Sequence, residues 1–150
     1  MANESPLIHD GAQCVLGFDA RNSTITGTTL YGPSGSGQYC AVVLGTTART
    51  LRLPTSAGEQ IYGVLQNKGS TGSVADVGIF GITKAVAAFT ASSDAITPGV
   101  LVRASTLAGG FLLYSTVAGT YPAGIALTGA ANGDVFTMAL YGFGRGGANL

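Results

Sequence analysis

The sequence predicts a mainly β fold, a small β-barrel or sandwich built from two similar β units and preceded by an extended N-terminal arm. Short apolar runs, rich in β-branched and aromatic residues, are broken every several residues by Gly, Pro, Asn or Ser, which is typical of strands and turns. A segment of the first half recurs in the second half, and the Gly/Ser-rich beginning of the chain belongs to neither copy. These observations indicate antiparallel strands with little helix.

The turn residues delimit eleven expected strands. In chain order these are Gln13–Phe18, Thr24–Tyr31, Gln38–Leu44, Thr50–Leu53, Gln60–Leu65, Val74–Phe80, Ile82–Phe89, Val100–Ala104, Phe111–Ser115, Gly124–Leu127 and Asp134–Tyr141.

The repeat becomes visible when the sequence is shifted against itself by sixty-one positions, so that the segment from Thr55 lies over the segment from Thr116 without a gap. The identities are Thr55/Thr116, Ala57/Ala118, Gly58/Gly119, Gly63/Gly124, Gly72/Gly133, Val74/Val135 and Gly81/Gly142. We therefore expect an N-terminal arm and loop over residues 1–36 and a single β domain over 37–150, with duplicated units at 37–81 and 99–142. Recurrent hairpin chemistry in a Gly-rich chain is the alternative explanation.

The duplicated units also predict the core. The residues expected to point inward are Val64, Val74, Val77, Ile79, Ile125, Val135, Met138 and Leu140.

Charged residues are scarce, at 9% of the chain, and the seven basic side chains balance the seven acidic ones. A neutral chain presents no basic surface for nucleic acid and no field that keeps copies of itself apart. No run of eighteen apolar residues indicates a membrane span, and the beginning of the chain lacks the pattern of a secretory signal. We expect a protein made in the cytoplasm that self-associates or docks on another protein, with neither nucleic acid nor membrane as a partner.

Two glycine motifs match the sequence patterns of nucleotide-binding loops but lack other features that such loops need. Residues 142–147 satisfy GxGxxG, but only three residues follow, whereas the motif needs a helix whose N-terminus holds the phosphates. Residues 32–37 have the spacing of a P-loop, but Gln38 stands where the phosphate-binding Lys belongs. We expect both to be loops and no cofactor to bind.

The sequence also offers no catalytic or metal site. The single histidine, His9, has no Ser or Cys nucleophile in a recognised setting, and the acidic residues are scattered singly. Asn22 opens a glycosylation sequence that has no use without secretion. Cys14 and Cys40 both lie in apolar surroundings, and we expect inert core thiols, with a disulfide between them as the alternative.

An apolar cluster near the N-terminus is the candidate partner-binding site. Pro6, Leu7 and Ile8, followed by His9, stand between Glu4 and Asp10, outside both repeat units. Because a proline and an extended apolar stretch make poor helix, this segment is suited to reach a neighbouring subunit. A frayed terminus without a partner is the alternative.

The order of motifs in the last ninety residues resembles the decoration, or cement, proteins of tailed-phage capsids. The matching pieces are Gly63-Val64, Gly72 to Val77, Gly81 to Val86, Ala95-Ile96-Thr97 with Gly99, Gly124-Ile125-Ala126-Leu127 and Gly133-Asp134-Val135. Each is a turn followed by a strand, and their order and spacing carry the resemblance.

This resemblance implies a structural accessory protein without catalytic residues. It would be made in the host cytoplasm, bind the exterior of the capsid in the virion, contact the major capsid protein, form a homotrimer and stabilise the head by linking capsomers. A receptor- or glycan-binding module of a phage head or tail fibre is the competing interpretation, because such modules share the β content and the Ser/Thr/Gly-rich surface. A small enzyme is the third.

Overall fold

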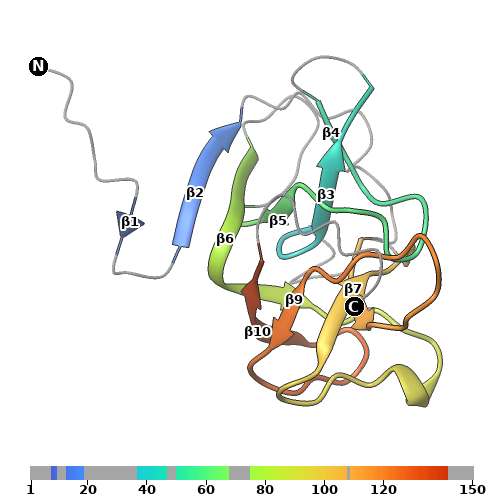
Figure 1. Ribbon diagram of the computed structural model, residues 1–150. Helices are drawn as coiled ribbons and strands as arrows, with labels where there is room; N and C mark the ends of the chain where they lie inside the picture. The colour runs from blue at the N-terminus through green and yellow to red at the C-terminus, as the bar shows by residue number, and fades with distance from the viewer. Residues whose placement is uncertain are drawn as a thin grey trace, which may run out of the picture.

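The computed structural model describes residues 8–9, 13–18, 37–46, 50–67, 75–107 and 109–141, with residues 8–9 and 13–18 described by their backbone alone. Apart from one short 3-10 turn at Ser92–Asp94, the regular elements in these ranges are strands (Figure 1). Their bounds are β1 Ile8–His9, β2 Gln13–Phe18, β3 Ala41–Leu44, β4 Leu51–Arg52, β5 Gly63–Leu65, β6 Ala75–Val86, β7 Leu101–Ala104, β8 Phe111–Leu113, β9 Gly124–Ala126 and β10 Val135–Leu140. The predicted strand at Thr24–Tyr31 lies outside the described residues.

The strands form one curled antiparallel sheet in the order β4-β3-β5-β6-β10-β9-β7-β8, and β2 pairs with β6 beside this path. An isolated parallel bridge joins Ala87, just after β6, to Phe111 of β8. The adjacent Ala88 N–H donates to the Phe111 carbonyl at 2.7 Å. These contacts bring the last strand of the path back to the end of β6, so the sheet curls around a core. The mainly β fold predicted from the sequence is confirmed.

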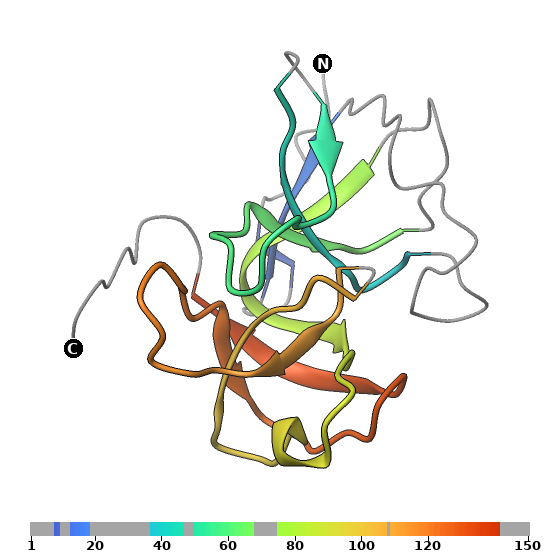
Figure 2. The same ribbon diagram turned by 90° about the vertical axis from the view of Figure 1, so that its right-hand side faces the viewer.

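The two halves of the sheet are similar β units. The path β4-β3-β5-β6 in the first unit matches β8-β7-β9-β10 in the second. Their registers match as well, because Val64 lies opposite Gly78 as Ile125 lies opposite Ala139. Figure 2 shows the units one above the other, with β6 passing from the upper to the lower.

Strand β6 differs from its prediction, since one strand replaces the two expected at Val74–Phe80 and Ile82–Phe89. Gly81, where a break was expected, lies inside β6 at φ 97°, a conformation that glycine adopts without strain. The first half of β6 pairs with β5 and β2, and its second half pairs with β10. β6 is therefore the last strand of the first unit and also a strand of the second.

Strand β2 lies within residues 1–36, the segment expected as arm and loop, and pairs with the first half of β6. Val15 of β2 lies opposite Gly78, as Ile82 lies opposite Ala139 in the second unit. Gly78 and Ala139 are equivalent residues. In the first unit β2 therefore occupies the position that residues 81–86 of β6 occupy in the second unit. The sheet therefore begins before residue 37.

Each unit contributes equivalent residues to a buried cluster. Val42, Leu65 and Val77 pack in one cluster, and their equivalents Val102, Ala126 and Met138 pack in the other. Of the predicted core residues, Val64, Val77, Met138 and Leu140 are buried, whereas Ile79 and Ile125 are half-buried. Val74 lies outside the described residues.

Val135 was predicted wrongly as a core residue, because it is 39% exposed. Side chains of a strand alternate between its two faces, and β10 buries Phe136, Met138 and Leu140. Val135 therefore points away from the core.

Among the described residues, the structure contains no helix long and apolar enough to cross a membrane.

Candidate functional site

An apolar row crosses the outer face of the second unit. Ile82 of β6 lies opposite Ala139 of β10, Ala139 lies opposite Ile125 of β9, and Ile125 lies opposite Leu101 of β7. Directly opposed residues in neighbouring strands share a face of the sheet, and the adjacent row, which includes Met138 and Ala126, is the buried one. This outer row of Ile82, Ala139, Ile125 and Leu101 is called the apolar row below.

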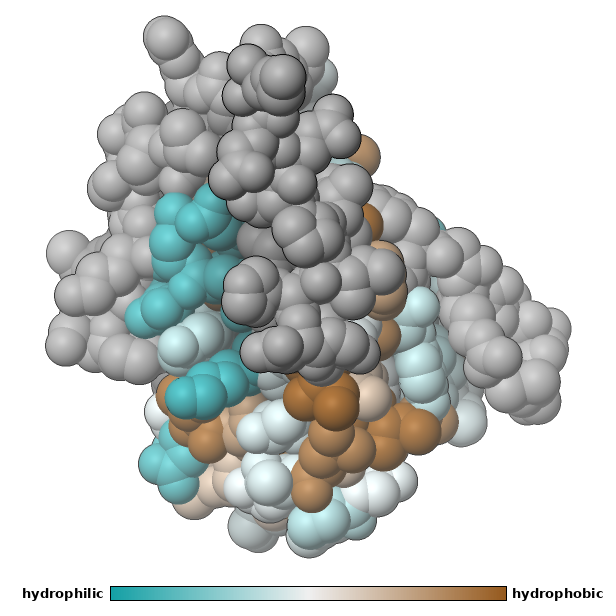
Figure 3. All heavy atoms as spheres, turned by 90° about the vertical axis from the view of Figure 1, so that its left-hand side faces the viewer, coloured by the Kyte–Doolittle hydropathy of each residue, from teal (hydrophilic) through white to brown (hydrophobic). Residues whose placement is uncertain are grey.

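The apolar row is open to solvent in part. Ile82 is 49% exposed, and the other members are half-buried. Phe80, in the same strand as Ile82, is 47% exposed. Figure 3, which faces the left-hand side of Figure 1, shows brown apolar residues gathered on this side of the described molecule. Large apolar side chains that share a face and remain accessible mark a surface suited to bind another protein.

The equivalent row of the first unit is covered. Its members include Ala41, Val64 and Gly78, all of them buried. Ala41 and Val64 belong to the same cluster as Phe111 and Phe136 of the second unit. One copy of this surface is therefore used inside the molecule, and the other copy remains accessible.

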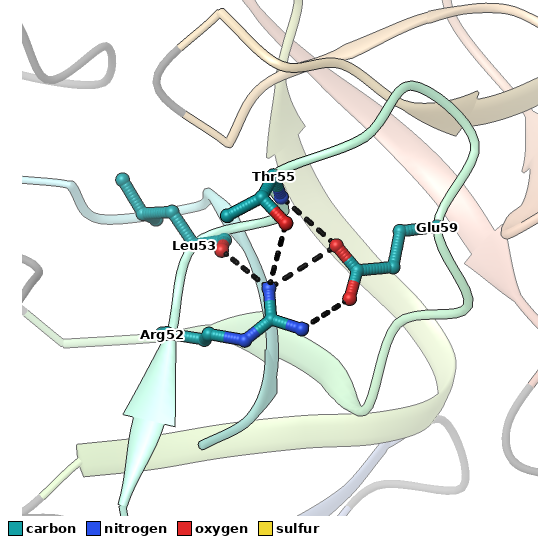
Figure 4. A network of polar contacts seen from close by, with 4 residues as sticks. All are labelled: Arg52, Leu53, Thr55 and Glu59. Carbon is teal, nitrogen blue, oxygen red and sulfur yellow. Dashed lines mark hydrogen bonds and ion pairs between the residues drawn. The ribbon is translucent and has the colours of Figure 1, made fainter. Parts of the chain in front are cut away.

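A second candidate feature is the polar network around Arg52 (Figure 4). The Arg52 guanidinium donates to both carboxylate oxygens of Glu59, with Nη1 to Oε2 at 3.2 Å, and also to the Leu53 carbonyl at 3.1 Å. The Thr55 N–H donates to the same carboxylate at 2.8 Å. The hydrogen bond from Arg52 holds the pKa of Glu59 below its usual value, although partial burial opposes the shift. This network fixes the turn between β4 and β5.

The Arg52 network has the properties of a structural brace. Each charged group has the other as its partner, and the pKa of Arg52 is raised by its hydrogen bond to Glu59. A carboxylate held in its charged form by an arginine is a poor proton acceptor at neutral pH. Among the residues that the structure describes, no group of three or more His, Cys, Asp or Glu side chains could hold a metal ion.

The structure describes only part of the predicted partner-binding segment, and that part by its backbone alone. Pro6 and Leu7 lie outside the described residues, and Ile8 and His9 form β1, which pairs with β2 through Ile8 opposite Cys14 and His9 opposite Gln13. Their role as a partner-binding segment stays a prediction.

Cys40 is buried, and burial raises the pKa of its thiol to about 12. Its place in the core agrees with the expectation from the sequence. The side chain of Cys14 lies outside the described residues. So do residues 142–147 and, apart from Gly37, the loop at 32–37.

Sequence reasoning missed the apolar row and the Arg52 network. The row joins residues from four strands, so it emerges only when the register between strands is known. Arg52 and Glu59 are seven residues apart, across a turn whose shape sets their contact. The repeat alignment places Ile125 over Val64, but it predicts both residues as core and so does not identify the accessible row.

No family model matches the sequence, and no curated protein matches it. Solved structures do include a similar chain, the N base of head fiber gp8.5 in bacteriophage phi29. The TM-score is 0.58, and the match covers 84% of this chain and 93% of that chain. Sequence identity is 12%, so the likeness establishes a shared fold.

Proposed function

We propose that the protein is a non-enzymatic, structural accessory protein of a phage head. It binds the outer face of the capsid and stabilises the head by linking capsomers. The observation that supports this proposal best is the fold shared with the phi29 head fiber base over 84% of the chain. The order of turn-and-strand motifs, which resembles capsid decoration proteins, is a second and separate support.

The apolar row supplies a surface for this role. A capsid-binding protein must attach to a protein lattice without enzymatic chemistry, and burial of apolar side chains is the main favourable term in such association. The row is continuous, because its members come from adjacent strands of one sheet. We propose that it contacts the major capsid protein, and that the segment Pro6–His9 adds contacts as an arm.

The remaining parts of the proposal concern assembly and place. The protein would be made in the host cytoplasm, join the capsid exterior as a homotrimer and need neither nucleic acid nor membrane. Its low charge, 9% of residues, supports self-association because few charged groups must be desolvated when copies meet.

The test is binding of the purified protein to phage capsids that were assembled without it. We expect wild-type protein to sediment with the capsids at a fixed stoichiometry and to raise their melting temperature. Ile82→Asp places a charge in the apolar row, so we expect lower occupancy at the same concentration. Thr97→Asp, at an exposed position outside the row, is the control and should bind as wild type does.

Wild-type protein that stays in the supernatant at saturating concentration would overturn the capsid proposal. Equal occupancy by wild type and Ile82→Asp would show that capsid binding uses another surface.

A receptor- or glycan-binding module of a phage head or tail fibre is the second candidate. The similar solved structure is a head fiber, and this favours the candidate. In this case the protein would bind host cells or isolated surface glycans. Its contact with the capsid would attach it to the virion without stabilising the head. Titration of fluorescently labelled protein onto host cells separates the two functions.

A further inference from the structure

The first unit docks one of its turns onto the second unit. This turn, residues 55–58, ends at Gly58, whose N–H donates to the Ala104 carbonyl at 2.8 Å. In return, the Tyr121 N–H donates to the Gly58 carbonyl at 2.8 Å. A Cβ atom on Gly58 would overlap the side chain of Thr120. The turn is therefore seated closely against Ala104, Thr120 and Tyr121, which are called the seat below.

The second unit has the same turn, but none of the described residues seats it. Residues 116–119 are equivalent to 55–58, and Gly119 has φ 80° where Gly58 has φ 74°. Val117 is 62% exposed, the highest value among the exposed large apolar residues described. A Cβ atom on Gly119 would meet nothing within 4 Å. In Figure 2 the orange chain around this turn projects at the left of the lower unit.

The first unit has an equivalent of the seat. The registers place Leu44 where Ala104 lies, and the repeat alignment places Glu59 and Gln60 where Thr120 and Tyr121 lie. All three line an open cleft of about 300 Å³, together with Val43, Arg52, Ile61 and Tyr62. Leu44 is 51% exposed. Each molecule therefore carries an unseated turn at one unit and an equivalent, accessible seat at the other.

We propose that a second copy of this chain inserts its 116–120 turn into this cleft. The Gly119 N–H would donate to the carbonyl of Leu44 of the partner subunit, and its own carbonyl would accept from the N–H of the partner's Gln60. This contact repeats between molecules the pair of hydrogen bonds that Gly58 already makes within one molecule. Val117 would cover the partner's Leu44, which removes two exposed apolar side chains from water.

The two surfaces of this contact are different, so it joins copies head to tail. Such a heterologous contact closes into a ring when the rotation between copies allows it. The inference follows from the internal repeat and does not depend on a phage origin or on capsid binding.

The test uses two variants that each damage one side of the contact. Val117→Asp alters the turn, and Leu44→Asp alters the cleft. Both positions are exposed, so the fold should be retained, and circular dichroism checks this. In sedimentation velocity we expect wild type to associate. Each variant alone should have a dissociation constant about tenfold higher than that of wild type, because its contact would bury an unpaired carboxylate. Leu127→Asp, also at an exposed apolar position, should associate as wild type.

Mixing the two variants gives the decisive result. Val117→Asp keeps an intact cleft and Leu44→Asp keeps an intact turn, so an equimolar mixture should form a one-to-one dimer that does not grow further. Wild-type protein that remains monomeric would overturn the proposal, as would variants that associate normally. A mixture that stays monomeric although wild type associates would also overturn it, because a contact between identical surfaces gives that result.

Discussion

Phe136 and Val135 are neighbours in β10, and only Phe136 lies in the core, with 2% of its surface exposed. Its ring meets that of Phe111 edge to face, at 6.2 Å between centroids and 81° between planes. Removal of a buried aromatic ring leaves a cavity, so Phe136→Ala should lower the free energy of unfolding by about 3–5 kcal/mol. Urea denaturation measures this change.

Val135→Asp is the matched control. Because this side chain points outward, the variant should lower the free energy of unfolding by only about 0.5–1 kcal/mol, mainly through reduced strand propensity. A loss as large as that of Phe136→Ala would show that Val135 is buried after all.

At the scale of single strands, the equivalent glycines Gly63 and Gly124 allow the closest approach between neighbours. A Cβ atom on Gly63 would overlap the Gly78 carbonyl, and one on Gly124 would overlap the Ala139 carbonyl. Backbone oxygens cannot move aside without loss of strand pairing, so Gly63→Ala and Gly124→Ala should each cost about 3 kcal/mol or more, through overpacking that the sheet cannot relieve.

Gly119→Ala separates steric overlap with a neighbouring strand from the strain of a positive φ angle. In the monomer, Gly119 has φ 80° and a Cβ atom there would meet nothing within 4 Å, so Gly119→Ala should cost about 1–2 kcal/mol through backbone strain alone. Thermal melting of the three variants should place Gly119→Ala closest to wild type. If all three melt together, close backbone approach is not the reason for the glycines.

The turn after β4 should be sensitive to acid through Glu59. Its pKa is lowered in the folded state by the hydrogen bond from Arg52, so the pair stabilises the fold above the unfolded pKa, roughly 4.3. This stabilisation is lost as pH falls through the folded pKa. Glu59→Gln lacks this stabilisation. The free energy of unfolding, measured by urea denaturation, should therefore be about 0.5–1 kcal/mol higher for wild type than for Glu59→Gln at pH 6, and this difference should shrink toward pH 3.

Arg52→Gln is the partner variant for this measurement. When Arg52→Gln is already present, adding Glu59→Gln should change the free energy of unfolding less than it does in wild type. The double variant should therefore lose less stability than the sum of the two single variants. A gap between wild type and Glu59→Gln that is constant with pH would mean that the carboxylate does not act through its charge.

At the scale of the whole molecule, the sequence predicted the β class and the two similar units because turn residues and strand periodicity are local. It predicted Val64 and Met138 as buried for the same reason. The prediction that Val135 is buried was wrong because the repeat alignment matches positions without regard to the face of the sheet. Residues three apart in a strand, such as Val135 and Met138, point to opposite sides. The apolar row and the seat depend on register, which only the folded sheet supplies.

The shared strand β6 has a consequence for cooperativity. Its first half completes the ladder of one unit and its second half belongs to the ladder of the other. A cut at Gly81 would therefore leave each fragment with an unpaired strand edge, and melting of either unit would strip hydrogen bonds from its neighbour. Two similar units that share one strand should therefore unfold together in a single step, with calorimetric and van't Hoff enthalpies in agreement.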